Sequence, residues 1–168
     1  LRAHELGADF TKAPELWEID TLTDALPDIL TRKPELLKQV PDFICFIALN
    51  YVTDTRITAM LYDLAEKLSD ASTRTAFLAH SLLGDALQST DPAQARESYR
   101  RSLAIARHLV EIWPEDLQVR WDLAVALDNV AGMLKHSDPG QALKLYMESL
   151  DIRRELDERL SGDVQARR

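Results

Sequence analysis

The stretch TDPAQARESYRRSLAIARHLVE, residues 90–111, and the stretch SDPGQALKLYMESLDIRRELDE, residues 137–158, decide the fold, because they are two copies of one pattern. A shift of 47 places superimposes them, and 11 of the 21 positions from 91 to 111 are then identical. Repetition at a fixed spacing predicts a repeat architecture in which neighbouring copies share one core. The identical pairs are Asp91/Asp138, Pro92/Pro139, Gln94/Gln141, Ala95/Ala142, Tyr99/Tyr146, Ser102/Ser149, Leu103/Leu150, Ile105/Ile152, Arg107/Arg154, Leu109/Leu156 and Glu111/Glu158.

The first copy is predicted to form two helices. The first of them carries small and apolar side chains at three- and four-residue spacing, which places them on one helix face. Asp91 is expected to cap the second helix, with Pro92 at its first position, where a missing N–H costs nothing. Pro114 is expected to stop that helix just after Trp113. The residues of the first stripe are Ala76, Ala79, Leu83, Ala86 and Leu87.

The second copy is predicted to repeat this scheme. Its first helix is expected from Asp116 to about Lys135, and its second helix is expected to begin at Asp138-Pro139 and to stop at Ser161-Gly162. The connections are too short for anything except antiparallel hairpins.

The chain therefore divides into an N-terminal helical segment, residues 1–70, and a repeat region, residues 71–168. The N-terminal segment contains a possible diverged hairpin over 42–69, formed by helices at 42–53 and 55–69. The repeat region is expected to hold two tandem hairpins and the start of a third. Asp163, Gln165 and Arg167 repeat the order of Asp116, Gln118 and Arg120, so we expect the array to continue beyond Arg168.

The composition favours a folded, helical protein and excludes several classes of partner. Hydrophobic residues make up 46% of the 168 residues and charged residues 29%, with only 5 Gly. The net charge of −8 argues against binding to nucleic acid or to an anionic membrane surface, because both need clustered Lys and Arg. The longest apolar stretch, 43–49, is far shorter than a membrane helix. Cys45 is the only cysteine, which favours a reducing, cytoplasmic location.

The repeat resembles the tetratricopeptide repeat family over residues 72–161. The first copy has that family's Leu83-Gly84 pair, Ala95, the aromatic Tyr99, the Ser102-Leu103 pair and the terminating Pro114. The second copy keeps Ala142, Tyr146 and Ser149-Leu150, but has Val130-Ala131 and Ser161-Gly162 at the other two places. The spacing of 47 exceeds the family's usual 34 or so, and is similar to that of the long-repeat variety found in kinesin light chains.

The resemblance implies an all-α fold: antiparallel helical hairpins stacked as a short right-handed solenoid, with the N-terminal helical segment packed on it. It also implies a protein–protein interaction scaffold that binds a protein or peptide through its concave face, without cofactor or catalysis. The first helix of each hairpin lines that face in the family. The contact residues expected there are Leu78, Ser81, Asp85, Gln88, Trp121, Val125, Asp128, Asn129 and Lys135.

Two details of this surface shape the expected ligand. Some family members bind a partner's C-terminal carboxylate through cationic side chains on these helices. This chain has Asp85 and Asp128 at the equivalent places, which would repel a carboxylate, so a neutral or basic peptide is expected as the ligand. Trp121 is either an aromatic anchor for the partner or a residue packed on the preceding helix. Trp17 and Trp113 are expected in the core.

Two alternative functions follow from other features. The C-terminal hairpin leaves an uncapped apolar face, which would suit self-association into a homo-oligomer. The spacing of Arg74 and His80 in RTAFLAH is similar to that of helical ribonucleases of the HEPN group. His4, His80, His108 and His136 show no metal-ligand spacing, and no nucleophile or phosphate-loop motif is present. The sequence thus predicts a binding protein rather than an enzyme.

Overall fold

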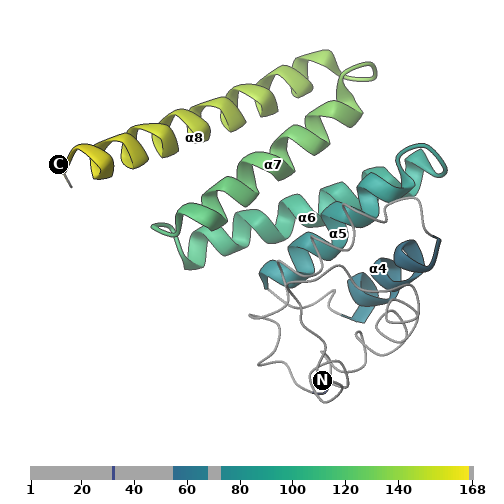
Figure 1. The fold of residues 1–168 in the computed structure, drawn as a ribbon. Helices are drawn as coiled ribbons and strands as arrows, with labels where there is room; N and C mark the ends of the chain where they lie inside the picture. Colours follow the sequence, from purple (N-terminus) through teal and green to yellow (C-terminus); the bar gives the residue numbers. More distant parts are fainter. Residues whose placement is uncertain (1–31, 33–54, 68–72, 167–168) are drawn as a thin grey trace.

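The computed structural model describes Arg32, residues 55–67 and residues 73–166, and within these it shows helices and no strand. The elements are α4 (Thr55–Lys67), α5 (Arg74–Leu87), α6 (Pro92–Ile112), α7 (Leu117–Leu134) and α8 (Pro139–Ala166). They lie side by side in chain order, with α4 and α8 at opposite ends of the row (Figure 1). The expected helix at 42–53 lies outside the described residues, whereas α4 confirms the one expected at 55–69.

The helix starts of the repeat region are where the sequence predicts them. The Asp91 carboxylate accepts a hydrogen bond from the Gln94 N–H at 3.0 Å, and Asp138 accepts one from Gln141 at 2.9 Å. Asp116 accepts bonds from Gln118 and Val119. Because these side chains satisfy N–H groups that have no partner inside the helix, each aspartate fixes where its helix begins.

The predicted stop at Ser161-Gly162 is wrong, because α8 continues through this pair to Ala166. In the first copy Pro114 occupies the place of Ser161, and proline cannot supply the N–H that a further helical turn requires. Serine and glycine keep that N–H, and one glycine costs a helix only about 1 kcal/mol. Residues 163–166, expected to open a third copy, therefore belong to α8.

The helices of each copy pack as antiparallel neighbours joined by short turns. Four residues separate α5 from α6, α6 from α7 and α7 from α8, which leaves room only for a reversal of direction. Each helix packs on the next along the chain, and α7 also touches α5. One continuous hydrophobic core results, running from Ile57 on α4 to Leu145 on α8.

The tightest contact in this core lies between α5 and α6. A Cβ atom added at Gly84 would come within 2.5 Å of Tyr99 Cε1, closer than atoms can approach. The ring of Tyr99 is buried, and its hydroxyl donates a hydrogen bond to Asp85 at 2.7 Å. In the second copy Ala131 replaces Gly84, and the equivalent Tyr146 is exposed. Glycine at 84 therefore allows the first tyrosine to lie flat against its partner helix.

We expect Gly84→Ala to destabilise the protein by roughly 1–3 kcal/mol, because the added methyl group forces the Tyr99 ring out of its site. Chemical denaturation monitored by circular dichroism measures the change. The matched control is Gly132→Ala, whose added Cβ would lie 3.7 Å from the nearest atom. That variant should be more stable by about 0.5–1 kcal/mol, because alanine favours a helix more than glycine does. Equal effects of the two substitutions would contradict this account of the Gly84 contact.

Candidate functional site

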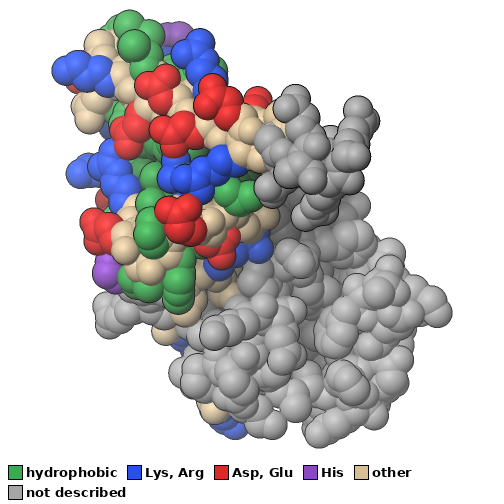
Figure 2. All heavy atoms as spheres, turned by 90° about the vertical axis from the view of Figure 1, so that its left-hand side faces the viewer, with side chains coloured by type: hydrophobic (Ala, Val, Ile, Leu, Met, Phe, Trp, Pro, Cys, Tyr) green, Lys and Arg blue, Asp and Glu red, His purple; other side chains and the backbone are tan. Residues whose placement is uncertain are grey.

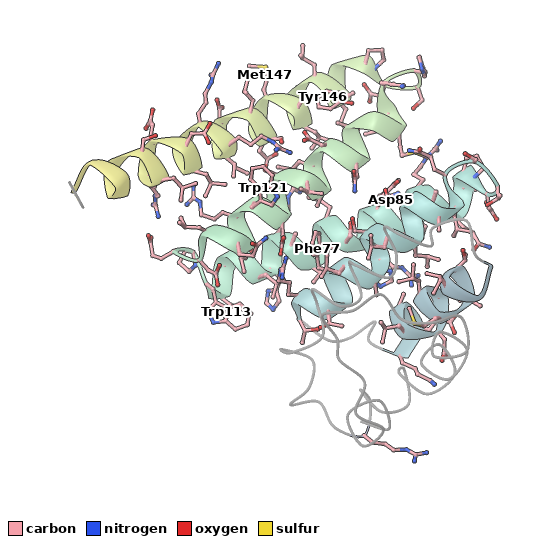
Figure 3. The ribbon with its side chains drawn as sticks, in the orientation of Figure 1. Phe77, Asp85, Trp113, Trp121, Tyr146 and Met147 are labelled. Atoms are coloured by element: carbon pink, nitrogen blue, oxygen red, sulfur yellow. The ribbon has the colours of Figure 1, made fainter. Side chains whose placement is uncertain are left out.

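The first helix of the second copy presents a solvent-facing stripe that contains four of the predicted contact residues. Trp121, Val125, Asp128 and Lys135 follow one another at spacings of four, three and seven, so they share one face of α7. Trp121, which Figure 3 labels on α7, and Lys135 are exposed, while Val125 and Asp128 are half-buried. We call these four residues the α7 stripe. The opposite side of the helix is buried in the core.

The equivalent positions of the first copy are not all available to a ligand. Leu78 and Ser81, predicted as contact residues, are buried, so this part of the prediction is wrong. Their side of α5 faces α7, and Asn129 of α7 donates a hydrogen bond to the Ser81 hydroxyl at 3.2 Å. Asn129 thus joins the two copies. Only Asp85 and Gln88, near the C-terminal end of α5, remain exposed among the four predicted residues of this helix.

Asp85 is engaged by its own hairpin. The loss of water around its carboxylate raises the pKa of Asp85, and the hydrogen bond from Tyr99 partly offsets that rise. The same burial, together with the bond to Asp85 and its negative charge, raises the pKa of Tyr99. Tyr99 therefore remains the hydrogen-bond donor of the pair at neutral pH.

Trp121, Arg153 and Asp128 form a compact group between α7 and α8. The Arg153 guanidinium lies 4.6 Å from the centre of the Trp121 ring, within the range of a cation–π contact. Its Nη2 donates a hydrogen bond to Asp128 Oδ2 at 2.6 Å. The ring keeps 44% of its surface exposed, so the group fixes an indole in place without covering it. The contact that the structure gives for the Trp121 ring is thus with α8, the helix that follows α7.

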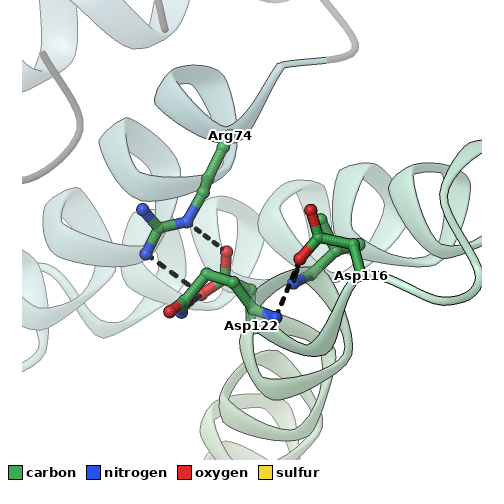
Figure 4. Close-up of polar contacts among 5 residues, drawn as sticks. Arg74, Asp116 and Asp122 are labelled. Carbon is green, nitrogen blue, oxygen red and sulfur yellow. Dashed lines mark hydrogen bonds and ion pairs between the residues drawn. The ribbon is translucent and has the colours of Figure 1, made fainter. Parts of the chain in front are cut away.

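Arg74 pairs with a buried carboxylate on α7. Its Nε donates to Asp122 Oδ2 at 2.6 Å and its Nη2 to Asp122 Oδ1 at 3.4 Å (Figure 4). Gln118 donates a further hydrogen bond to Asp122 at 3.0 Å. Because the Asp122 side chain is only 5% exposed, little water reaches its carboxylate, and these donors stabilise its charge. The pair joins the first helices of the two copies.

We expect Asp122→Ala to destabilise the protein by about 3 kcal/mol, near the lower end for a broken buried pair because Arg74 is partly exposed. Thermal and chemical denaturation measure the loss. The control is Glu148→Ala, which removes an exposed interhelical pair with Arg107 and should cost less than about 1 kcal/mol. A similar cost for both variants would show that burial of the Asp122 charge does not matter.

His80 lies beside a pocket between α4, α5 and α6. The side chain is only 3% exposed, and within the described part of the chain neither ring nitrogen has a hydrogen-bond partner. The pocket has a volume of about 240 Å³ and includes Tyr62, Glu66, Glu97 and Arg101 in its lining. Burial, aided by the nearby Arg101 charge and opposed by Glu97, lowers the pKa of His80 to about 4. The imidazole is thus neutral at pH 7.

Arg74 and His80, the ribonuclease-like pair, contact different elements. Their positions differ by six, which corresponds to about 120° around the helix axis. Arg74 reaches Asp122 on α7, whereas His80 borders the pocket against α4 and α6. Each side chain therefore has its own surroundings.

We expect the NMR resonances of the His80 ring to remain those of a neutral imidazole as the pH falls, changing only near pH 4. Between about pH 6.5 and 4 the unfolded chain binds a proton at this position that the folded chain does not, so stability decreases as pH falls. In His80→Leu, which copies Leu127 of the second repeat, this decrease should be shallower by up to one proton. A His80 titration midpoint near 6.5 would contradict the prediction.

Charged side chains of α6, α7 and α8 pair with one another and with the α6–α7 turn. Arg107 of α6 pairs with Glu148 of α8, Arg159 pairs with Glu115 of the α6–α7 turn, and Arg120 pairs with Glu155. Figure 2 shows acidic and basic side chains interspersed on one face, with hydrophobic side chains between them. The arginines thus neutralise acidic neighbours and form no basic surface there.

Neither a metal site nor a membrane helix is found within the described ranges. No three or more His, Cys, Asp or Glu side chains there gather as metal ligands would. None of the described helices combines the length and apolarity required to cross a bilayer. Comparison with protein-family models, with curated proteins and with solved structures finds no match for this chain.

A second exposed surface lies on α8, in the C-terminal hairpin for which the sequence predicts an uncapped apolar face. Leu143, Tyr146, Met147 and Leu150 are exposed at spacings that place them on one helix face. We call these four residues the α8 stripe. These residues are not among the predicted contact residues, because their spacing is equally typical of a core-facing stripe and only the packing of α8 shows which side chains are exposed. Trp113, expected in the core, is also exposed, at 47%.

Proposed function

We propose that this chain is a protein–protein interaction scaffold, built as a short tetratricopeptide-like solenoid, and that it binds a peptide segment of a partner protein along the α7 stripe. The observation that carries the proposal is the half-exposed Trp121 ring held in place by Arg153 and Asp128. Tryptophan is enriched at the energetic centres of protein interfaces, where its large rigid surface gains area at small entropic cost.

The surroundings of Trp121 support a peptide as the ligand. Val125 adds apolar surface one turn further along α7, and Lys135 and Gln88 provide polar groups near the C-terminal ends of their helices. An apolar centre with a polar edge is the usual arrangement of a peptide-binding surface. The chain supplies this surface from rigid helices, so little order is lost on binding.

The charges favour a neutral peptide with an aromatic or aliphatic anchor. Arg153 neutralises Asp128, and Asp85 accepts a hydrogen bond from Tyr99. Asp128 is thus paired with a cation within the protein, whereas Asp85 keeps its negative charge. A basic residue in the ligand could still pair with Asp85, which remains exposed.

The proposal includes no catalytic step and no cofactor. Arg74 and His80, the candidate catalytic pair, point to different neighbours, and the pKa of about 4 leaves His80 uncharged at neutral pH. Their roles in this proposal are structural. The chain acts by holding its partner.

A peptide-display library selected against the full chain should yield binders whose affinity falls about tenfold or more in Trp121→Ala, because the indole supplies the centre of the contact. Isothermal titration calorimetry with a selected peptide measures the affinity. The matched control is Trp113→Ala, which removes an equally exposed indole from the α6–α7 turn. It should change the affinity by less than about twofold.

Two results would contradict the proposal. One is a set of selected peptides that bind equally well to wild type and to Trp121→Ala. The other is a loss of binding in Trp113→Ala but not in Trp121→Ala, which would move the site to the α6–α7 turn.

A further inference from the structure

The α8 stripe is an apolar surface that does not belong to the proposed peptide site. Its residues are substantially exposed, and no other described helix covers them. The exposed fractions are 60% for Leu143, 40% for Tyr146, 56% for Met147 and 46% for Leu150. Figure 3 shows Tyr146 and Met147 on α8, the last helix of the row. A contiguous apolar face of this kind on a small, acidic protein marks an interaction surface.

Comparison of the two copies shows which part of the stripe is peculiar to α8. Tyr99 and Leu103 of α6, the equivalents of Tyr146 and Leu150, are buried in the core. Their exposure on α8 reflects the lack, among the described helices, of a neighbour corresponding to α7. The other two positions differ in chemistry: α6 has the exposed Arg96 and Arg100 where α8 has Leu143 and Met147.

This difference decides between two kinds of occupant. A further helix packed on α8 as α7 packs on α6 would cover Tyr146 and Leu150. It would leave Leu143 and Met147 in water, as Arg96 and Arg100 are. Exposure to water does not stabilise leucine or methionine side chains, whereas a charged arginine side chain is usually exposed to water. The occupant of the α8 stripe must therefore reach further round the helix than a following repeat does.

We propose that the occupant is the α8 stripe of a second copy of this chain, packed antiparallel about a two-fold axis near Met147. In such a contact, residues on opposite sides of the axis face each other, so Leu143 of one copy lies near Leu150 of the other, and Leu150 near Leu143. All four apolar side chains are then covered together. The short repeat of apolar residues at positions 143, 146, 147 and 150 suits the interdigitation of two helices.

The charges beside the stripe fit this arrangement. Lys144 and Asp151 are exposed and lie seven residues apart, hence on the same flank of α8. An antiparallel pair places the N-terminal part of one helix beside the C-terminal part of the other. Lys144 of each copy then faces Asp151 of its partner, because the two-fold axis of an antiparallel pair keeps the same flanks of the two helices on one side of the contact. To pair with Lys144 of the partner, Asp151 gives up its exposed ion pair with Arg154 of the same helix.

The contact is small beside a stable interface, which covers about 800 Å² on each partner. We therefore expect a weak dimer that dissociates in roughly the micromolar range. Sedimentation velocity of the full chain, over concentrations that span about a hundredfold, should show a monomer–dimer equilibrium. A monomer throughout this range overturns the proposal.

Substitutions that copy α6 onto α8 test which face forms the dimer. Leu143→Arg combined with Met147→Arg gives α8 the residues that α6 has at these positions, so the helix tolerates them. This variant should be monomeric with an unchanged circular dichroism spectrum. The control is Leu160→Glu, which removes an exposed leucine from another side of α8 and should leave the dimer intact. A dimer that survives Leu143→Arg with Met147→Arg overturns the proposal.

A charge exchange tests the antiparallel arrangement. Lys144→Glu alone and Asp151→Lys alone should each weaken the dimer severalfold, because each brings like charges together across the axis. The double variant restores opposite charges and should recover the wild-type dissociation constant. If the double variant does not recover affinity, the antiparallel contact is overturned. This holds also when the Leu143→Arg and Met147→Arg variant shows that the α8 stripe forms the dimer.

Discussion

Close approach of neighbouring helices is the constraint on which this structure depends. The side chains that are completely buried between helices are mostly small: Ala76, Ala79, Ala95, Ala106 and Ser102 show no exposed surface. Small residues let two backbones come near enough for long side chains on either side to interlock. Gly84 is the extreme case, because Tyr99 occupies the space that any Cβ would need. Hence the order of small and large residues, rather than hydrophobicity alone, sets the hairpin geometry.

The polar contacts follow from that packing. Once α5 and α7 lie close, Arg74 can reach Asp122 and Asn129 can reach Ser81, so side chains 48 residues apart become bonded. Ser149 similarly donates to the backbone carbonyl of Ala124 at 3.0 Å. Such bonds satisfy polar groups that the packing has wholly or partly removed from water. The Arg74–Asp122 and Asn129–Ser81 bonds join one hairpin to the next, and the Ser149 bond joins the two helices of the second hairpin.

Local features of the fold could be predicted from the sequence because their causes are local. An aspartate followed by a proline starts α6 and α8, since cap and first residue are adjacent in the chain. The helix end expected at about Lys135 lies at Leu134, and the equivalent end of α5, Leu87, is 47 residues earlier. The end of α8 could not be predicted in the same way. There the second copy lacks the proline that stops α6. Ser161 and Gly162 reduce helix stability only slightly, so the sequence alone does not decide whether the helix ends at them.

Burial of individual site residues was harder to predict because it depends on distant partners. Leu78 and Ser81 have the spacing of surface residues on an isolated hairpin, but α7 covers their side of α5. Trp121 is the equivalent of Arg74 in the second copy. It remains exposed, because no described helix packs on α7 in the way that α7 packs on α5. Periodicity identifies a face of a helix. It does not say what packs on it.

The two copies together separate what the fold requires from what the surface is free to vary. Some buried positions are unchanged between them, such as Ser102 and Ser149, whereas others differ, such as Thr75 and Asp122. On the surface, three charged residues differ: Arg96 and Arg100 become Leu143 and Met147, and the partly exposed Arg74 becomes Trp121. Each change replaces a charged side chain by a large apolar one, and burial in the core of this chain explains none of them. A change from charge to apolar surface costs solubility unless another molecule covers it. The second hairpin thus differs from the first at the two surfaces that we propose as binding surfaces.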